Sequence, residues 1–301
     1  MFIQSIHFDK ISFKKKKTNR TAKIMLPTLL LIGTPLIDAN IKSDAFIKSE
    51  TKTFIPKEIR ELSSTNIAEK VGIDTKDYFI KRALKNKTIT IDAGHGGTTK
   101  DQTTFSKPYG TKYYDNKNKK WIYEKDINLK IAKEIENILK QTGANIVMTR
   151  DSDSYITLTD RAEKANESKS NMFVSIHVNA NKSKKINGPE IYLCTKSTKT
   201  DTQKAAKNLA EQLNKRLTTL YKINENKIRY VGFNVLKDTE NIPGVLVETG
   251  YLTNQKDRDF LINEENQLKL AKEIAGGIID FWLQKQEEKD NALFFAGNTK
   301  N

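Results

Sequence analysis

Between residues 86 and 285 the chain alternates between two patterns of hydrophobic positions. One pattern is a short, nearly continuous apolar run, which is typical of a strand buried on both faces of a sheet. The other pattern places apolar residues three or four positions apart, which is typical of a helix packed on one side. The runs predict strands at residues 87–92, 145–149, 171–177, 189–195, 234–237 and 244–248, and the spaced pattern predicts helices at 126–141, 157–169, 201–220 and 264–283.

Strands that alternate with helices in this way predict an α/β fold. Such units form a parallel sheet, and their crossover helices cover both of its faces. We therefore expect one domain, residues 86–285, with a mainly parallel, roughly six-stranded sheet between two layers of helices. Ligand sites in such sheets lie at the C-terminal ends of the strands, so the residues that end each apolar run are the first candidates for a site.

The N-terminus has the features of a secretory signal peptide. A basic stretch at residues 14–23 precedes an apolar run at 24–37, and Ala39 offers a small residue for cleavage. The apolar run is shorter than the ~20 residues that a membrane-spanning helix needs. We expect residues 1–39 to be a signal, with an uncleaved membrane anchor as the alternative. The mature protein would then be exported to the periplasm, the cell exterior or the wall, with no stable membrane span.

Two further segments flank the predicted domain. Residues 40–85 are polar and rich in lysine, and we expect a linker or a short helical N-terminal segment there. Residues 286–301 form a polar C-terminal tail in this interpretation. The single cysteine, Cys194, excludes an intrachain disulfide, so the stability of the domain must come from its hydrophobic core.

The formal net charge of +15 has two interpretations. In the first, lysines fill the solvated surface without a specific role; in the second, they attract an anionic polymer such as nucleic acid, a membrane surface or a cell wall. The lysines are spread along the chain and do not gather on one helix, which disfavours nucleic-acid binding. An exported protein would also meet no nucleic acid, so we expect none as a partner.

Four polar residues stand where the predicted strands end or a helix begins. His95 follows the run at 87–92, His177 ends the run at 171–177, Glu248 ends that at 244–248, and Glu124 precedes the helix at 126. Two histidines and one glutamate are a common ligand set for catalytic zinc. A further carboxylate can serve as general base toward water.

Each of these residues also has a purely structural interpretation. A histidine at the end of a strand is often a hydrogen-bonded surface residue, and Glu124 suits the positive end of a helix dipole. Glycines at residues 94, 96 and 97 allow a sharp turn near a ligand, and the run lacks the Gly-Lys-Ser/Thr of a phosphate-binding loop. An unpaired carboxylate at Glu248 would be costly at the end of an apolar strand. Together these points favour a metal site.

Five segments resemble successive motifs of the N-acetylmuramoyl-L-alanine amidase family with the zinc-dependent type 3 catalytic domain. They occur in the family's order, and five motifs in register are far more specific than one. The segments are TITIDAGHGG (88–97), EKDINLKIA (124–132), RAEKAN (161–166), FVSIHVNAN (173–181) and GVLVETGYLTN (244–254).

The resemblance implies an enzyme that hydrolyses the amide bond between N-acetylmuramic acid and L-alanine in peptidoglycan. It implies one zinc ion (Zn2+) bound by His95, Glu124 and His177, with Glu248 as the catalytic residue. It also leaves room for a protein activator. Two features depart from the family: Ala93 stands where proline is frequent, and the stretch between His95 and Glu124 is long and rich in lysine and tyrosine.

Further expectations concern the substrate. Asn179 and Arg229 are candidate substrate contacts, and the aromatic residues between 109 and 123 either stack on sugar or peptide stem or form a partly buried loop. The alternative functions are a zinc carboxypeptidase or other amidohydrolase that acts on wall peptides, and a wall-binding protein without catalysis.

Overall fold

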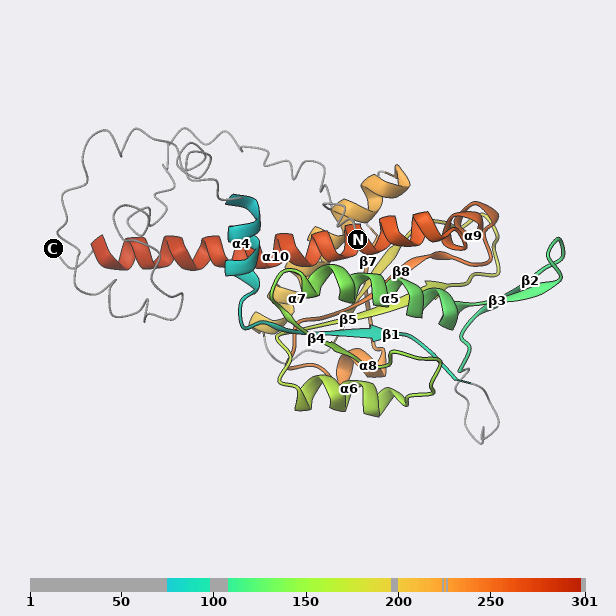
Figure 1. Cartoon of the computed structure of the whole chain (residues 1–301), viewed down its shortest axis with the longest axis horizontal. Coiled ribbons are helices and arrows are strands. Elements are labelled where there is room, and N and C mark those ends of the chain that lie inside the picture. Colours follow the sequence, from blue (N-terminus) through green and yellow to red (C-terminus); the bar gives the residue numbers. More distant parts are fainter. Residues whose placement is uncertain (1–74, 98–107, 196–199, 224, 226, 299–301) are drawn as a thin grey trace, which may run out of the picture. The chain divides into compact units, whose positions relative to one another are not determined.

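The computed structural model describes residues 75–97, 108–195, 200–223, 225 and 227–298 (Figure 1). The chain divides into two units, Met1–Ile73 and Asp74–Asn301. The proposed signal peptide at residues 1–39 and most of the predicted N-terminal segment lie outside the described residues. Within the described part of the chain, no helix has both the length and the apolar character that crossing a membrane requires.

A six-stranded sheet forms the centre of the second unit, in the order β4-β1-β5-β8-β6-β7 (Figure 1). All neighbouring strands are parallel except β6 and β8, which are antiparallel. The predicted α/β class and mainly parallel sheet are therefore confirmed. The strands are β1 (Thr88–Ala93), β4 (Asn145–Met148), β5 (Met172–Asn179), β6 (Glu190–Cys194), β7 (Ile228–Val231) and β8 (Gly244–Tyr251).

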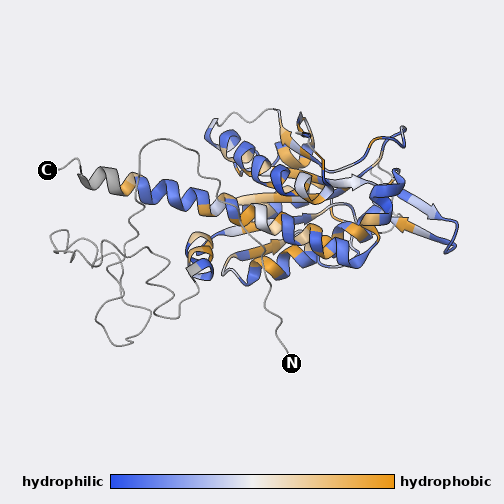
Figure 2. Ribbon diagram, turned by 90° about the horizontal axis from the view of Figure 1, so that it is seen from above, coloured by the Kyte–Doolittle hydropathy of each residue, from blue (hydrophilic) through white to orange (hydrophobic). Residues whose placement is uncertain are grey.

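Helices cover both faces of the sheet, as expected. On one face lie α5 (Glu124–Lys140), α7 (Thr200–Tyr221) and α10 (Glu264–Asn298), and on the other lie α6 (Leu158–Glu167) and α8 (Asn234–Lys237) (Figure 1). Apolar side chains of the strands and of the helices that cover them are buried and form the core, and hydrophobic stretches of ribbon lie in the strands at the centre of Figure 2. The α6 side is sealed by a buried cluster of Ala165, Phe173, Val235, Leu236, Ile242 and Leu246.

One predicted element is wrong, and several were not foreseen. Residues 234–237 form α8 instead of a strand, with Val235 and Leu236 buried. A four-residue apolar segment does not reveal its periodicity, so packing decides its conformation. The unforeseen elements are β7, the hairpin of β2 (Lys112–Asp115) and β3 (Lys120–Tyr123), and α9 (Gln255–Leu261).

The two ends of the described unit pack on each other. Helix α4 (Thr75–Leu84) lies against α10, which continues well past the predicted end at residue 283. The Arg82 guanidinium donates two hydrogen bonds to the Asp290 carboxylate, at 2.9 and 2.7 Å. The segments assigned to the N-terminal segment and to the polar tail therefore contact each other through these two helices. The part of α10 that follows the domain core, before its last turns, is hydrophilic (Figure 2).

Candidate metal centre

The three predicted ligands come together at the C-terminal edge of the sheet. His95 follows β1, His177 lies in β5, and Glu124 is the first residue of α5. Glu124 Oε1 is 2.9 Å from His177 Nδ1 and 3.4 Å from His95 Nε2. One ligand atom from each residue lies within 4.8 Å of the other two. Two imidazole nitrogens and a carboxylate oxygen at this spacing fit a catalytic zinc ion.

Backbone and amide donors fix the carboxylate of Glu124, which is only 4% exposed. Its Oε1 accepts hydrogen bonds from the Val178 amide at 3.1 Å and Asn128 Nδ2 at 3.3 Å, and its Oε2 accepts one from the Thr111 amide at 2.7 Å. Burial acts to raise the pKa of Glu124, but hydrogen bonds and charge from His177 and His95 bring it below its usual value. The group is therefore ionised at neutral pH, as a metal ligand must be.

Glycines allow the elements to approach this closely. A Cβ on Gly94 would lie 2.4 Å from the His177 ring. Gly110 has φ +66°, and a Cβ there would lie 2.2 Å from Glu124 Oε2 and 2.7 Å from His95 Cδ2. His95 itself has φ 58°, in the left-handed region that few residues other than glycine adopt. The loop that carries His95 therefore has a strained backbone conformation beside the site.

Gly110→Ala is expected to weaken zinc binding about ten- to a hundredfold, the range seen when the support of a ligand is lost. Gly143→Ala is the matched control, because Gly143 also has positive φ (+82°) but nothing lies within 4 Å of its Cβ position. Both variants strain the backbone by about 1–2 kcal/mol, and only the first collides with Glu124. Zinc titration against a competing chelator measures the difference, and equal affinities would show that Gly110 does not shape the site.

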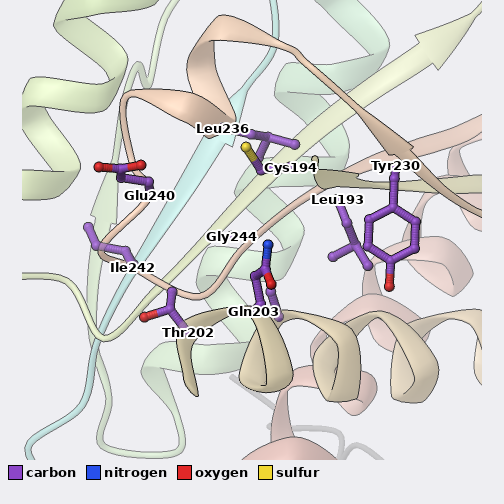
Figure 3. A pocket seen from close by; sticks show the side chains of 10 residues that line it. Leu193, Cys194, Thr202, Gln203, Tyr230, Leu236, Glu240, Ile242 and Gly244 are labelled. Atoms are coloured by element: carbon purple, nitrogen blue, oxygen red, sulfur yellow. The ribbon is translucent and has the colours of Figure 1, made fainter. Parts of the chain in front are cut away.

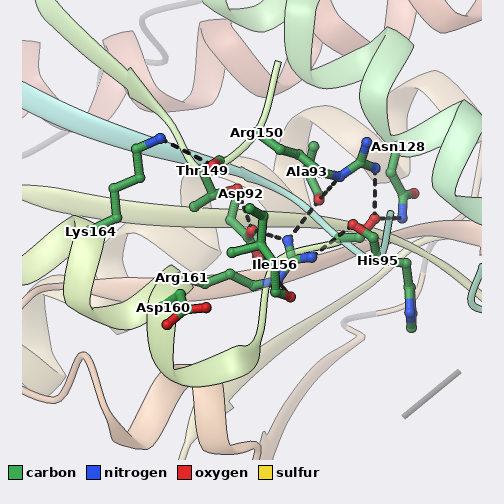
Figure 4. Close-up of polar contacts among 12 residues, drawn as sticks. Asp92, Ala93, His95, Asn128, Thr149, Arg150, Ile156, Asp160, Arg161 and Lys164 are labelled. Carbon is green, nitrogen blue, oxygen red and sulfur yellow. Dashed lines mark hydrogen bonds and ion pairs between the residues drawn. The ribbon is translucent and has the colours of Figure 1, made fainter. Parts of the chain in front are cut away.

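Two buried arginines hold the loop that carries His95 (Figure 4). Arg150 donates to the carbonyls of Ala93 at 2.7 Å and Gly94 at 3.0 Å. Arg161 donates to the carbonyls of Ala93 at 2.8 Å and His95 at 2.7 Å. Three successive carbonyls thus point at guanidinium groups, and these charged hydrogen bonds stabilise the strained loop. Burial and then the charge of Arg161 lower the pKa of Arg150 to about 10, so Arg150 remains a cation at neutral pH.

Asp92 completes this network. Its carboxylate accepts hydrogen bonds from Arg161 Nη1, Thr149 Oγ1 and Ser175 Oγ, each at 2.6 Å. Burial acts to raise the pKa of Asp92, and Arg161 with the two hydroxyls lowers it below its usual value. The sequence analysis included Arg161 in a family motif without predicting a role for it, and it did not identify Arg150. A charged residue that flanks a buried apolar run was the available signal.

Glu248 lies beside His177 in the register of β8 and β5. Its Oε2 is buried and has no hydrogen-bond partner among the described residues. Burial, and then the nearby carboxylates of Glu124 and Glu190, raise the pKa of Glu248 well above its usual value. Such an unpaired oxygen is costly in a folded protein, and a polar substrate or water at the centre would satisfy it.

Glu190 is a neighbour that sequence reasoning missed. It faces Glu248 directly across β6 and β8 and is 8% exposed. Tyr192 Oη donates a 2.6 Å hydrogen bond to Glu190 Oε2. The antiparallel pairing of β6 brings this carboxylate to the site, and residue spacing alone did not predict that pairing.

The two candidate substrate contacts differ in position. Asn179 ends β5, two residues beyond His177, and its Oδ1 accepts a hydrogen bond from the Ala180 amide at 2.7 Å. Arg229 is exposed on the edge strand β7, so β6 lies between it and the strand of Glu248. The fold therefore places Asn179, but not Arg229, next to the predicted ligands.

A separate pocket lies at the end of the sheet that faces away from the metal centre, where β6 ends (Figure 3). Because β6 runs antiparallel to β8, its C-terminus points away from the metal centre. Helices α7 and α8 close this pocket, and the half-buried Cys194 lines it together with apolar side chains such as Leu236. The pocket and the predicted catalytic residues thus belong to different sites.

Fold and site together define an α/β domain with a candidate catalytic metal centre at the strand ends. Residues 89–280 match the protein family described as N-acetylmuramoyl-L-alanine amidase. The chain belongs to this family. Helix α4 and the part of α10 after residue 280 lie outside the matched range.

Curated relatives and solved structures agree with this assignment. The probable cell wall amidase LytH of Staphylococcus saprophyticus is 36% identical over 197 residues, which are 65% of this chain and 59% of that protein. The amidase LytC of Bacillus subtilis is 33% identical over 67% of this chain and 37% of its own length. This chain thus spans less than two thirds of the length of either relative. The N-acetylmuramoyl-L-alanine amidase of Clostridium difficile 630 is 34% identical, with a TM-score of 0.56, over 65% of this chain and 97% of that structure.

Proposed function

We propose that this protein is a zinc-dependent peptidoglycan amidase that hydrolyses the bond between N-acetylmuramic acid and L-alanine. The observation that carries the proposal is the cluster of His95, Glu124 and His177 beside the buried Oε2 of Glu248, which has no hydrogen-bond partner in the described part of the chain. Membership of the amidase family and the names of the relatives, such as cell wall amidase LytH, support it.

His95, Glu124 and His177 would hold the zinc ion. When bound, zinc polarises a carbonyl and lowers the pKa of water toward ~7. The Thr111 and Val178 amides keep the carboxylate of Glu124 in place, so the ligand set is largely formed in advance.

Glu248 would move the proton. In this mechanism it takes a proton from the water whose oxygen attacks the lactyl carbonyl carbon. It then gives that proton to the amide nitrogen as the carbon–nitrogen bond breaks, and L-alanine leaves as a free amine.

The proposed substrate, peptidoglycan, requires a location outside the cytoplasm. The signal-like residues 1–39 and the wall-associated relatives support export to the periplasm, the exterior or the wall. A protein activator is an additional proposed partner. A solved relative, the CwlD amidase of Clostridioides difficile, was determined in complex with the GerS lipoprotein, and it is 31% identical over 65% of this chain, with a TM-score of 0.55.

Digestion of purified peptidoglycan, with and without a chelator, tests the proposal. We expect mass spectrometry to find free peptide stems that begin with L-alanine, lost on chelation and restored by zinc. Shortened stems still attached to sugar would instead identify a carboxypeptidase. Zinc binding without any release, even with wall-associated proteins added, would favour a wall-binding protein.

A further inference from the structure

The long stretch between His95 and Glu124 forms a projecting β-hairpin. Its strands β2 and β3 pair in antiparallel register, with Lys112 opposite Tyr123 and Tyr114 opposite Trp121. The hairpin extends away from the six-stranded sheet (Figure 1).

The base of the hairpin is built into the metal centre. Strand β3 ends at Tyr123, and the next residue is Glu124. Thr111, just before β2, accepts a hydrogen bond from the Glu124 amide at 2.9 Å and donates its own amide to Glu124 Oε2 at 2.7 Å. A molecule bound along the hairpin would therefore end at the predicted ligands.

The two faces of the hairpin are unlike, because successive side chains of a strand point to opposite sides. On one face, the Arg258 guanidinium of α9 lies 3.7 Å from the centre of the Tyr113 ring, which ties this face to the domain. The other face carries Lys112, Tyr114, Trp121 and Tyr123. Trp121 is 47% exposed and Tyr114 is 37% exposed.

The aromatic rings of this open face form a row. Ring centroids are 5.1 Å apart for Tyr114 and Trp121, 6.4 Å for Trp121 and Tyr123, and 6.0 Å for Tyr123 and Tyr109. Lys112 Nζ lies 4.6 Å from the centre of the Trp121 ring and 4.8 Å from that of Tyr109. The row runs from near the hairpin tip to its base beside Glu124.

Hairpin stability explains only part of this arrangement. Cross-strand aromatic pairs contribute about 0.2–1 kcal/mol, and an isolated hairpin is marginally stable, so the pair of Tyr114 and Trp121 has a structural use. That use does not extend to Tyr109, which lies outside both strands and continues the row to the metal centre. Exposed aromatic groups of this kind usually mark a binding surface.

We propose that Tyr109, Lys112, Tyr114, Trp121 and Tyr123 form a platform for the glycan strand of peptidoglycan, next to the sugar whose amide is cut. This inference rests on the proposed function. Sugar rings present C–H groups to the electron-rich face of an aromatic ring, and their hydroxyl and acetyl oxygens can accept from Lys112. The peptide stem is less suited to this row, because four of the five residues are aromatic and Lys112 alone among them offers a charge to the stem carboxylates.

Fluorescence provides a test of binding that needs no catalysis. The chain has two tryptophans, and Trp282 is 9% exposed, so a ligand on the hairpin changes mainly the emission of Trp121. Peptide-free oligomers of alternating N-acetylglucosamine and N-acetylmuramic acid are expected to change this emission in a saturable way. Free stem peptides and poly(glycerol phosphate) are expected to have no effect. A response to either of these without a response to glycan would overturn the proposal.

Kinetics with two substrate lengths completes the test. Trp121→Ala is expected to raise KM about tenfold, equivalent to 1.4 kcal/mol, on fragments of several disaccharides, with kcat and the KM for a single muramyl peptide unchanged. Trp121→Phe should restore most of the affinity. Tyr78→Ala, on α4 at the far end of β1 and 53% exposed, should change neither value.

Two results would contradict the platform. If Trp121→Ala left the KM for long fragments unchanged, the aromatic row would only stabilise the hairpin. If it raised the KM equally for long fragments and for the single muramyl peptide, Trp121 would contact the peptide stem and not the glycan. If the unaltered protein cleaved no fragment at all, the proposed amidase function would fail, while the glycan titration would still decide the platform.

Discussion

Glu248→Gln is expected to lower kcat for peptidoglycan cleavage by about 10²- to 10⁴-fold, the usual contribution of a general acid–base group. Glutamine has the same shape but cannot carry the proton from water to the leaving amine. Zinc binding should persist, because the three ligands and the groups that orient them are unchanged. Steady-state rates and the zinc content of the purified variant test both parts of this prediction.

A matched variant controls for general effects of the substitution. Glu264 opens α10 and forms an exposed ion pair with Lys130, so Glu264→Gln should retain both activity and zinc. Full activity in Glu248→Gln would remove the proton-transfer assignment. Loss of zinc together with activity would instead make Glu248 part of the metal ligand set.

Asp92→Asn is expected to lower the free energy of unfolding by about 3–5 kcal/mol at neutral pH, the usual cost of breaking a buried ion pair. Asp92 and Arg161 are 1% and 3% exposed, and the variant would leave the Arg161 charge unpaired. The loop carrying His95 should loosen as well, because Arg161 also binds its carbonyls. Urea denaturation followed by circular dichroism measures the effect.

The pH dependence gives this prediction a definite sign. The folded pKa of Asp92 lies below its unfolded value of about 3.9. Its ionisation therefore contributes stability above the unfolded pKa, and this contribution is lost as the pH falls through the folded pKa. The difference between the original protein and Asp92→Asn should shrink below about pH 4. A difference independent of pH would mean that shape, and not charge, makes Asp92 important.

Asp77→Asn is the control for this experiment. Asp77 forms an ion pair with Lys81 one turn away on α4, and both side chains are about half exposed. Exposed pairs contribute at most about 1 kcal/mol, so the variant should unfold almost like the original protein across the same pH range.

Local patterns in the sequence were sufficient to predict the central strands and to place the candidate ligands at their ends. Residues 171–177 read as a buried apolar run, and that run is the start of β5 with His177 near its end. Thr157 was expected to cap a helix, and its side chain accepts a hydrogen bond from the Asp160 amide. Strand direction then placed His95 and His177 at one edge, because parallel strands end on the same side.

Other features depended on contacts between distant parts of the chain. Residues 234–237 have the same apolar character as a strand, and they form α8 because Val235 and Leu236 fill the core beneath α6. Glu190 reaches Glu248 only because β6 pairs antiparallel to β8. No periodicity in the sequence encodes that choice of partner.

The sequence by itself thus determined the α/β class, the main strands and the identity of the candidate ligands, because strand burial and metal chemistry are properties of short segments. The tertiary structure alone decided how the centre is supported. Arg150 and Arg161 reach the carbonyls of the loop carrying His95 from positions more than 50 residues away along the chain, and the hairpin places its row of rings beside Glu124. Such support consists of long-range hydrogen bonds and side-chain packing, which form only when the whole domain is assembled.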